Sequence, residues 1–106
     1  MTISSDSGYV TLINVFSVEP EHQQRLLDLL TLATESGVSK VKGFVSSSLH
    51  RSVDGKKVTM YAQWKSAEDY NAMRANTTTS PYLEEALTFA KFDPGMYEVV
   101  KVFKHS

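Results

Sequence analysis

The segment that most constrains the fold runs from a turn at Asp54-Gly55 to a helix start at Ser66. An Asp-Gly pair between two runs of strand-forming residues is a strong signal for a β-hairpin. Residues Val58 to Trp64 are rich in β-branched and aromatic types, which predicts a strand. Ser66 is a favourable helix N-cap, and acidic residues follow it in the first turn. The segment therefore predicts two antiparallel strands, the second of which leads directly into a helix.

Trp64, the only tryptophan in the chain, marks the point where this strand meets the helix, and Tyr70 follows on that helix. Successive strand residues point to opposite faces of a sheet. If the protein carries out chemistry, we expect it beside Trp64. One face of the strand carries Val58, Met60, Ala62 and Trp64, and the other carries Thr59, Tyr61 and Gln63.

The rest of the chain supplies further strands and helices. Residues Tyr9 to Phe16 form a predicted strand with two largely apolar faces, interrupted by Asn14, which indicates a central strand covered on both sides. Glu19-Pro20-Glu21 is predicted to open a helix, and Gln23 to Ser36 within it carry leucines at helical spacing, which predicts a core-facing helix with Gly37 as its C-cap. The remaining predicted elements are a strand at Phe44–Arg51, a helix at Ala67–Ala75, a helix at Pro81–Ala90 capped by Ser80, a turn at Asp93–Gly95 and a last strand at Met96–Lys104.

The predicted order is β-α-β-β-α-β, with the second helical region split in two. This order is typical of the ferredoxin-like α+β plait, an antiparallel four-stranded sheet with helices on one face. Residues 9–104 form the single predicted domain, and residues 1–8 form a polar tail that we expect to be disordered. Because the strands are apolar on both faces, the second face of the sheet must also be covered. A second copy of the chain, packed sheet against sheet, would cover it and give a homodimer, a dimeric α/β barrel.

The composition excludes several classes of function. Eleven basic and twelve acidic residues give a net charge of −1, which argues against nucleic acid or an anionic membrane as a partner. The chain has no cysteine, so it has no disulfides, thiolate nucleophiles or cysteine-bound metals. Its histidines and carboxylates do not follow metal-ligand spacing. No apolar run approaches the roughly 20 residues of a membrane span, and no signal peptide is evident, so we expect a cytoplasmic protein.

Several of these segments resemble the antibiotic biosynthesis monooxygenase superfamily of dimeric α/β-barrel proteins, and the resemblance extends from Val10 to Phe103. The chain is most similar to the branch that includes cofactor-independent, quinone-forming monooxygenases of aromatic polyketide pathways. The resemblance implies oxidation of an aromatic or quinol-like small molecule by O₂, with no metal, flavin or other cofactor. It is carried by Ile13–Phe16, Gly43–Val45, Ser48–Ser52, Asp54-Gly55, Tyr61–Trp64 and Tyr97–Val100.

The resemblance also assigns roles to individual residues. Trp64 and Tyr70 match the family's active-site tryptophan and tyrosine, which implies that they orient the substrate and oxygen species. The family's asparagine, four residues before that tryptophan, is Met60 in this chain, and an arginine on the last helix of the family corresponds to Glu84. The histidine that binds iron in the heme-degrading branch would fall near Arg74, so heme cleavage is not expected.

Four further residues are candidates for contact with the substrate. Asn14 is costly among apolar neighbours unless its amide is paired, within the protein or by a ligand. Met60 would make a pocket softer and more apolar. Tyr82 is expected to line the same pocket. His50, near a strand end, is a candidate general base, because histidine is the side chain most often used to transfer protons.

Three functions remain open at this point. The first is the cofactor-independent monooxygenase with Trp64 and Tyr70 as catalytic residues. The second is a non-catalytic dimeric barrel that binds a small ligand and has lost the family's polar groups, in which Trp64 is a core residue. The third is an isomerase or cyclase that uses His50 or Tyr70. Oxygen consumption separates the first from the other two.

Overall fold

The computed structural model describes residues 8–76 and 80–105, and its centre is a four-stranded antiparallel sheet. The strands lie in the order β2-β3-β1-β4, so the two strands β1 and β3 occupy the middle. This is the predicted ferredoxin-like α+β arrangement. Of the predicted N-terminal tail, residues 1–7 lie outside the described residues. The strands are β1 (Val10–Ser17), β2 (Phe44–Arg51), β3 (Lys57–Trp64) and β4 (Lys91–Tyr97).

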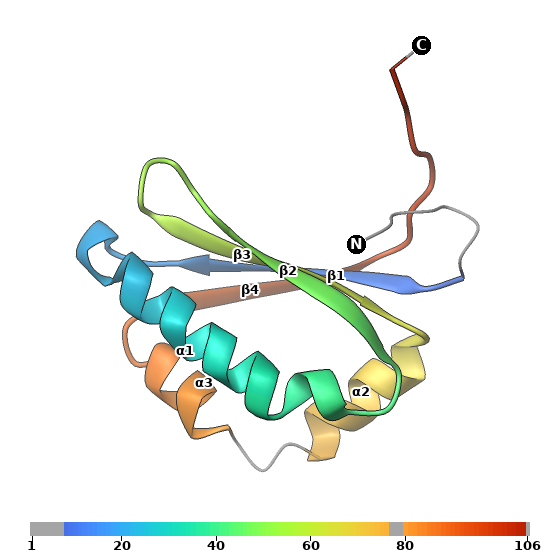
Figure 1. The fold of residues 1–106 in the computed structure, drawn as a ribbon, viewed down its shortest axis with the longest axis horizontal. Helices are drawn as coiled ribbons and strands as arrows, with labels where there is room; N and C mark the ends of the chain where they lie inside the picture. Colours follow the sequence, from blue (N-terminus) through green and yellow to red (C-terminus); the bar gives the residue numbers. More distant parts are fainter. Residues whose placement is uncertain (1–7, 77–79, 106) are drawn as a thin grey trace.

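All the helices pack on one face of the sheet, and the other face is left open (Figure 1). The order of helices and strands follows the prediction, except that α1 begins at Gln23, after a separate 3₁₀ turn at Pro20–His22, and that α3 is shorter than expected. It ends at Ala86, because residues 87–89 turn away to enter β4. The helices are α1 (Gln23–Ser36), α2 (Ala67–Asn76) and α3 (Pro81–Ala86), with 3₁₀ turns η1 (Pro20–His22) and η2 (Val38–Lys40).

The prediction for the last strand is wrong in its position. β4 spans Lys91–Tyr97 and contains Pro94 and Gly95, which the sequence places in a turn. An edge strand has a partner on one side only, and such strands tolerate proline. Phe92 fixes the strand, because its ring stacks on Phe16 of β1 with the ring centroids 4.7 Å apart. The alternating residues that follow have no neighbouring strand in the described chain, and residues 98–105 have no regular structure.

The hydrophobic core lies between the sheet and the helices. The side chains of Leu12 and Phe16 on β1, and of Ala62 and Trp64 on β3, all point to this side, as the alternation predicts. The core divides into two clusters. One is centred on α1 and α3 and the other on Trp64 and α2.

Two residues position α2 closely against the sheet. The Ser66 hydroxyl accepts a hydrogen bond from the Asp69 backbone N–H at 3.1 Å, so Ser66 caps the helix as predicted. Gly43 has a φ of +91°, and a Cβ at this position would overlap the side chain of Asp69. The Gly43 carbonyl accepts a hydrogen bond from the Lys65 backbone N–H at 2.8 Å. These contacts hold the first turn of α2 beside the start of β2.

A buried glutamine joins the start of α1 to the β2–β3 hairpin. The Gln23 amide Nε2 donates to the carbonyl of Ser52 at 3.2 Å and to that of Lys57 at 3.0 Å. Within the hairpin loop, the backbone N–H of Lys56 and the hydroxyl of Ser52 donate to Asp54 and hold the pKa of its carboxyl below the ordinary value. This stabilisation is present above the ordinary pKa and is lost as the pH falls through the lowered one.

We predict that Gln23→Leu lowers the free energy of unfolding by about 1–2 kcal/mol, because the carbonyl groups of Ser52 and Lys57 each lose one of their two donors and keep only a backbone N–H. Urea denaturation followed by circular dichroism measures this change. Gln24→Leu is the matched control, since Gln24 is exposed and bonds only within its own helix, to Asp28. The control should change stability by less than about 0.5 kcal/mol. Equal effects of the two substitutions would contradict a special role for Gln23.

Candidate active site

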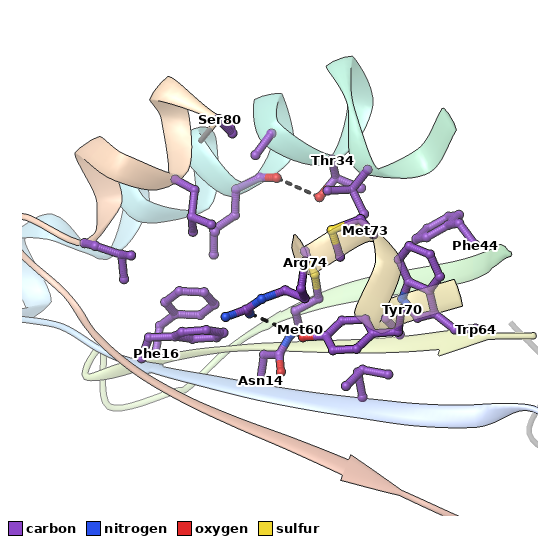
Figure 2. Close-up of a pocket in the computed structure, with 18 residues that line it drawn as sticks. Asn14, Phe16, Thr34, Phe44, Met60, Trp64, Tyr70, Met73, Arg74 and Ser80 are labelled. Atoms are coloured by element: carbon purple, nitrogen blue, oxygen red, sulfur yellow. Dashed lines mark hydrogen bonds between the residues drawn. The ribbon is translucent and has the colours of Figure 1, made fainter. Parts of the chain in front are cut away.

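A cavity of about 390 Å³ lies between the helix-covered face of the sheet and the helices (Figure 2). Its walls come from all three helices and from the strands, so no single element forms it. Most of its lining is aliphatic, aromatic or methionine side chain. The lining residues are Leu12, Asn14, Phe16, Leu30, Ala33, Thr34, Val38, Phe44, Met60, Ala62, Trp64, Tyr70, Met73, Arg74, Ser80, Leu83, Leu87 and Phe92.

Trp64 forms a fully buried part of the cavity wall. Its side chain is only 1% exposed, because it lies at the end of β3 where α2 begins. The ring of Phe44 and the ring of Tyr70 both contact it edge to face, each with centroids 5.6 Å apart. Such edge contacts favour well-defined ring positions. Trp64 is therefore a fixed wall that holds Tyr70 in place.

Asn14, Tyr70 and Arg74 form a polar corner in this apolar cavity (Figure 2). Nη1 of Arg74 donates to the Tyr70 hydroxyl at 3.4 Å, and the Arg74 guanidinium lies 5.7 Å from the centroid of the Phe92 ring. The Oδ1 atom of Asn14 is buried and has no hydrogen-bond partner among the described residues. The corner therefore offers hydrogen-bond donors, a positive charge and one unused acceptor.

The register between β1 and β3 accounts for the position of Asn14. Asn14 pairs with Met60 across the two strands, and directly paired residues share a face. Both side chains therefore enter the cavity. Of the six predicted site residues, these two, Trp64 and Tyr70 line the cavity.

His50 lies on the opposite side of the sheet, exposed, with its Nε2 atom 2.9 Å from the Ser48 hydroxyl. The reason is a β-bulge between Phe44 and Ser46, which shifts the alternation by one residue. After the bulge Leu49, rather than His50, faces the helices. The sheet therefore separates His50 from the cavity.

Tyr82 is also outside the cavity lining, because it is half-buried against the cluster formed by α1 and α3. Glu84 is exposed in the first turn of α3 and does not line the cavity either. Arg74 was not among the site residues predicted from the sequence. The four-residue spacing between Tyr70 and Arg74, which places them on one helix face, was the available signal.

The described residues show two further features. Within residues 8–76 and 80–105, no group of three His, Cys, Asp or Glu side chains is arranged to hold a metal ion. None of the helices in this part of the chain has the length and apolar character needed to cross a membrane.

We predict that Asn14→Leu raises the free energy of unfolding by about 1 kcal/mol, because it removes a buried oxygen that has no partner. The adjoining cavity leaves room for the leucine methyl groups. Urea denaturation measures the change, and Met60→Leu, a volume-conserving exchange at the paired position, serves as the control. Destabilisation by Asn14→Leu alone would mean that the amide is satisfied within the folded chain.

Comparison with known proteins gives one consistent result. A family model described as "Antibiotic biosynthesis monooxygenase" matches residues 9–85. The tetracenomycin-F1 monooxygenase of Streptomyces glaucescens is 39% identical over 102 residues, which cover 96% of this chain and 91% of that protein. A monooxygenase from the gene ActVA-Orf6 of Streptomyces coelicolor, solved in complex with the ligand nanaomycin D, has 28% identity and a TM-score of 0.75, with 93% of each chain covered.

A second solved structure shares the fold at lower identity. SnoaB, described as a cofactor-independent oxygenase from Streptomyces nogalater, has 18% identity and a TM-score of 0.74, with 92% of this chain and 99% of that chain covered. The curated relative and the two solved structures each match more than nine tenths of this chain.

Proposed function

Because this chain belongs to the antibiotic biosynthesis monooxygenase family, we propose that it is a cofactor-independent monooxygenase that oxidises a fused aromatic or quinol-like phenol with O₂. The observation that carries this proposal is an apolar cavity with one polar corner. The relative named for tetracenomycin F1 and the structure that holds nanaomycin D support a small-molecule substrate. The description of SnoaB supports a reaction without a cofactor.

The cavity suits a flat aromatic molecule. Its volume of about 390 Å³ lies in the range of small-molecule sites, and aromatic rings supply part of its wall. Phe16 and Phe92 stack on each other at one end of the lining, and Trp64 with Phe44 forms the other. A planar substrate between these ends would be shielded from water, with its oxygen atoms directed to the polar corner.

The proposed reaction begins with loss of a proton from a phenol or enol oxygen, which delocalises negative charge over the ring. The electron-rich ring carbon passes one electron to O₂, and the resulting radical and superoxide combine to form a C–O bond. The hydroperoxide then loses water and leaves a carbonyl group. In sum, a ring CH₂ group and O₂ become a C=O group and H₂O, so the substrate supplies all the electrons.

The protein contributes position and environment to this sequence. The apolar wall removes water from the reacting carbon, and the polar corner fixes the substrate oxygens. Tyr70 is the proposed catalytic residue that hydrogen-bonds the reacting oxygen, and Trp64 orients both Tyr70 and the ring. Asn14 accepts a hydrogen bond from a substrate hydroxyl. Met60 lines the cavity as a thioether and cannot donate a hydrogen bond.

Met60 also supports a second candidate, a binding protein that holds a small aromatic ligand without oxidising it. A thioether stands beside Asn14 where the resemblance implies an amide. Glu84, at the position of the family's arginine, is exposed outside the cavity. The same cavity would then bind the ligand and leave it unchanged.

We predict that the purified protein consumes O₂ and forms a quinone when supplied with an anthrone, without added metal or flavin. Tyr70→Phe should lower kcat/KM about 10²-fold, because it removes the hydroxyl and keeps the ring that packs on Trp64. An oxygen electrode and quinone absorbance measure both quantities. Tyr97→Phe, an equivalent change on the open face of the sheet, is the control.

Trp64→Phe and Met60→Asn complete the experiment. Trp64→Phe should also reduce turnover, because Tyr70 loses its fixed neighbour. Activity in Met60→Asn with none in the native protein would favour the binding protein. Oxygen uptake that is the same in the native protein and in Tyr70→Phe would contradict the proposed role of Tyr70.

We further propose that the protein is a homodimer in which the open faces of two sheets pack together. Ile13, Val15 and Tyr61 are only partly buried on this face. The C-terminal residues extend away from the sheet on the same side, and they carry exposed Val100 and Phe103 (Figure 1). An apolar face of this kind favours association with a second copy.

Light scattering coupled to size-exclusion chromatography should therefore give twice the 11.8 kDa chain mass. Val15→Lys, on the open face, should shift the protein toward the monomer while circular dichroism stays unchanged. Val53→Lys is the control, because Val53 is fully exposed in the hairpin loop. A native protein that elutes as a monomer at micromolar concentration would contradict the dimer.

A further inference from the structure

Arg74 lies where two hollows meet. The second hollow, of about 330 Å³, lies between α2 and the edge strand β4. It shares Leu12, Tyr70 and Arg74 with the main cavity, so these three residues form the boundary between the two. The other residues of the second hollow are Asn71, Pro94, Gly95 and Met96.

Arg74 is the one charged side chain among the described residues that line either hollow. Two contacts direct its guanidinium toward the polar corner. Nη1 donates to the Tyr70 hydroxyl at 3.4 Å, and the Phe92 ring lies beneath the guanidinium carbon at 5.7 Å. A cation over an aromatic face is held there electrostatically. Arg74 is itself an exposed residue, and these two contacts hold its guanidinium at the solvent-facing edge of the cavity.

The groups around this charge define the ligand that would fit. A guanidinium offers several N–H donors in a plane and binds an oxygen anion well. The buried Asn14 oxygen, which has no partner, needs a hydrogen-bond donor. A matching ligand therefore presents an ionised oxygen together with a neighbouring hydroxyl that keeps its proton.

We propose that Arg74 binds the ionised oxygen of a fused aromatic substrate that carries two adjacent oxygens, the second of which donates its proton to Asn14. This inference rests on the proposed function, and it assigns the substrate class and the group that stabilises the reacting anion. The phenol O–H bond breaks, its proton passes to water, and the electron pair stays on the substrate oxygen beside Arg74. The anion then reacts with O₂ as described above.

An oxygen anion near a fixed cation becomes easier to form, so the pKa of the bound phenol falls. Loss of Arg74 should reverse this effect. The side chain itself exchanges no atoms with the substrate. Its contribution is therefore measurable in a molecule that binds but does not react.

Alizarin, an anthraquinone with two adjacent phenol groups, is a suitable probe because its absorption moves to longer wavelength when it ionises. We expect the native protein to bind alizarin and to lower its apparent pKa by about one unit or more, a tenfold or larger shift in the ionisation constant. In Arg74→Met this shift should disappear. Arg74→Lys, which keeps the charge, should restore part of it.

Arg25→Met is the matched control. Arg25 also lies over a phenylalanine ring, that of Phe89, at 4.4 Å, but it is on α1, paired with Glu85 at 3.0 Å and outside both hollows. The control should bind and ionise alizarin as the native protein does. An equal pKa shift in native protein and Arg74→Met would overturn this inference and leave the proposed function standing.

Turnover gives an independent measurement. With an anthrone substrate, Arg74→Met should lower kcat/KM at least tenfold and move the acidic limb of the kcat–pH profile to higher pH, because the bound substrate ionises less readily. A native protein that shifts alizarin but shows no turnover would retain the inference about Arg74 and overturn the monooxygenase. Failure to bind alizarin would overturn the inference about Arg74, and a native protein that still consumed O₂ with an anthrone would retain the proposed function.

Discussion

The cavity depends on the register between β1 and β3 at the centre of the sheet. Val10 pairs with Trp64 and Ser17 with Lys57, so Asn14 lies directly opposite Met60. A slip of one residue would turn every side chain of a strand to the other face. Asn14 and Leu12 would then leave the cavity, and Ile13 would enter it. The apolar residues on the helix-covered side resist such a slip, since it would expose Phe16 and Leu12 to the open face.

Helix α2 supplies two of the polar side chains of the cavity, Tyr70 and Arg74. It is short, and one of its residues, Tyr70, is buried against Trp64. Its position depends on local features at its start, the Ser66 cap and the close approach that Gly43 permits. From this position, residues four apart on the helix direct both Tyr70 and Arg74 to the cavity. A change in the first turn of α2 would therefore alter the polar corner without touching it.

The cavity contains groups that have opposite effects on the free energy of unfolding. An apolar wall excludes water and favours a compact core, while the unpartnered Asn14 oxygen is unfavourable in such surroundings. Unsatisfied buried polar groups of this kind occur at functional sites, where a bound ligand completes the hydrogen bond. The polar corner is thus more consistent with a ligand that completes its hydrogen bonds than with an empty core.

The sequence predicted the parts of the structure that arise from local patterns. The hairpin at Asp54-Gly55, the helix at Gln23–Ser36 and the strand that ends at Trp64 follow from turn chemistry and periodicity. The resemblance and the alternation of strand residues also identified four of the residues that line the cavity. The last strand was misplaced, because Pro94 and Gly95 are strand residues only by virtue of pairing with β1.

Tertiary structure alone decided which polar groups meet. A bulge in β2 placed His50 on the open face, and strict alternation along the sequence contains no sign of that shift. In the sequence, Arg74 lies on a weakly amphipathic helix and resembles an ordinary surface residue. It lines the cavity because α2 packs beside Trp64 at the end of β3. The sequence by itself determined the family, the element order and the apolar lining, since these depend on near neighbours in the chain. The polar corner of Asn14, Tyr70 and Arg74 was decided by the fold, because it joins strand and helix residues far apart in the sequence.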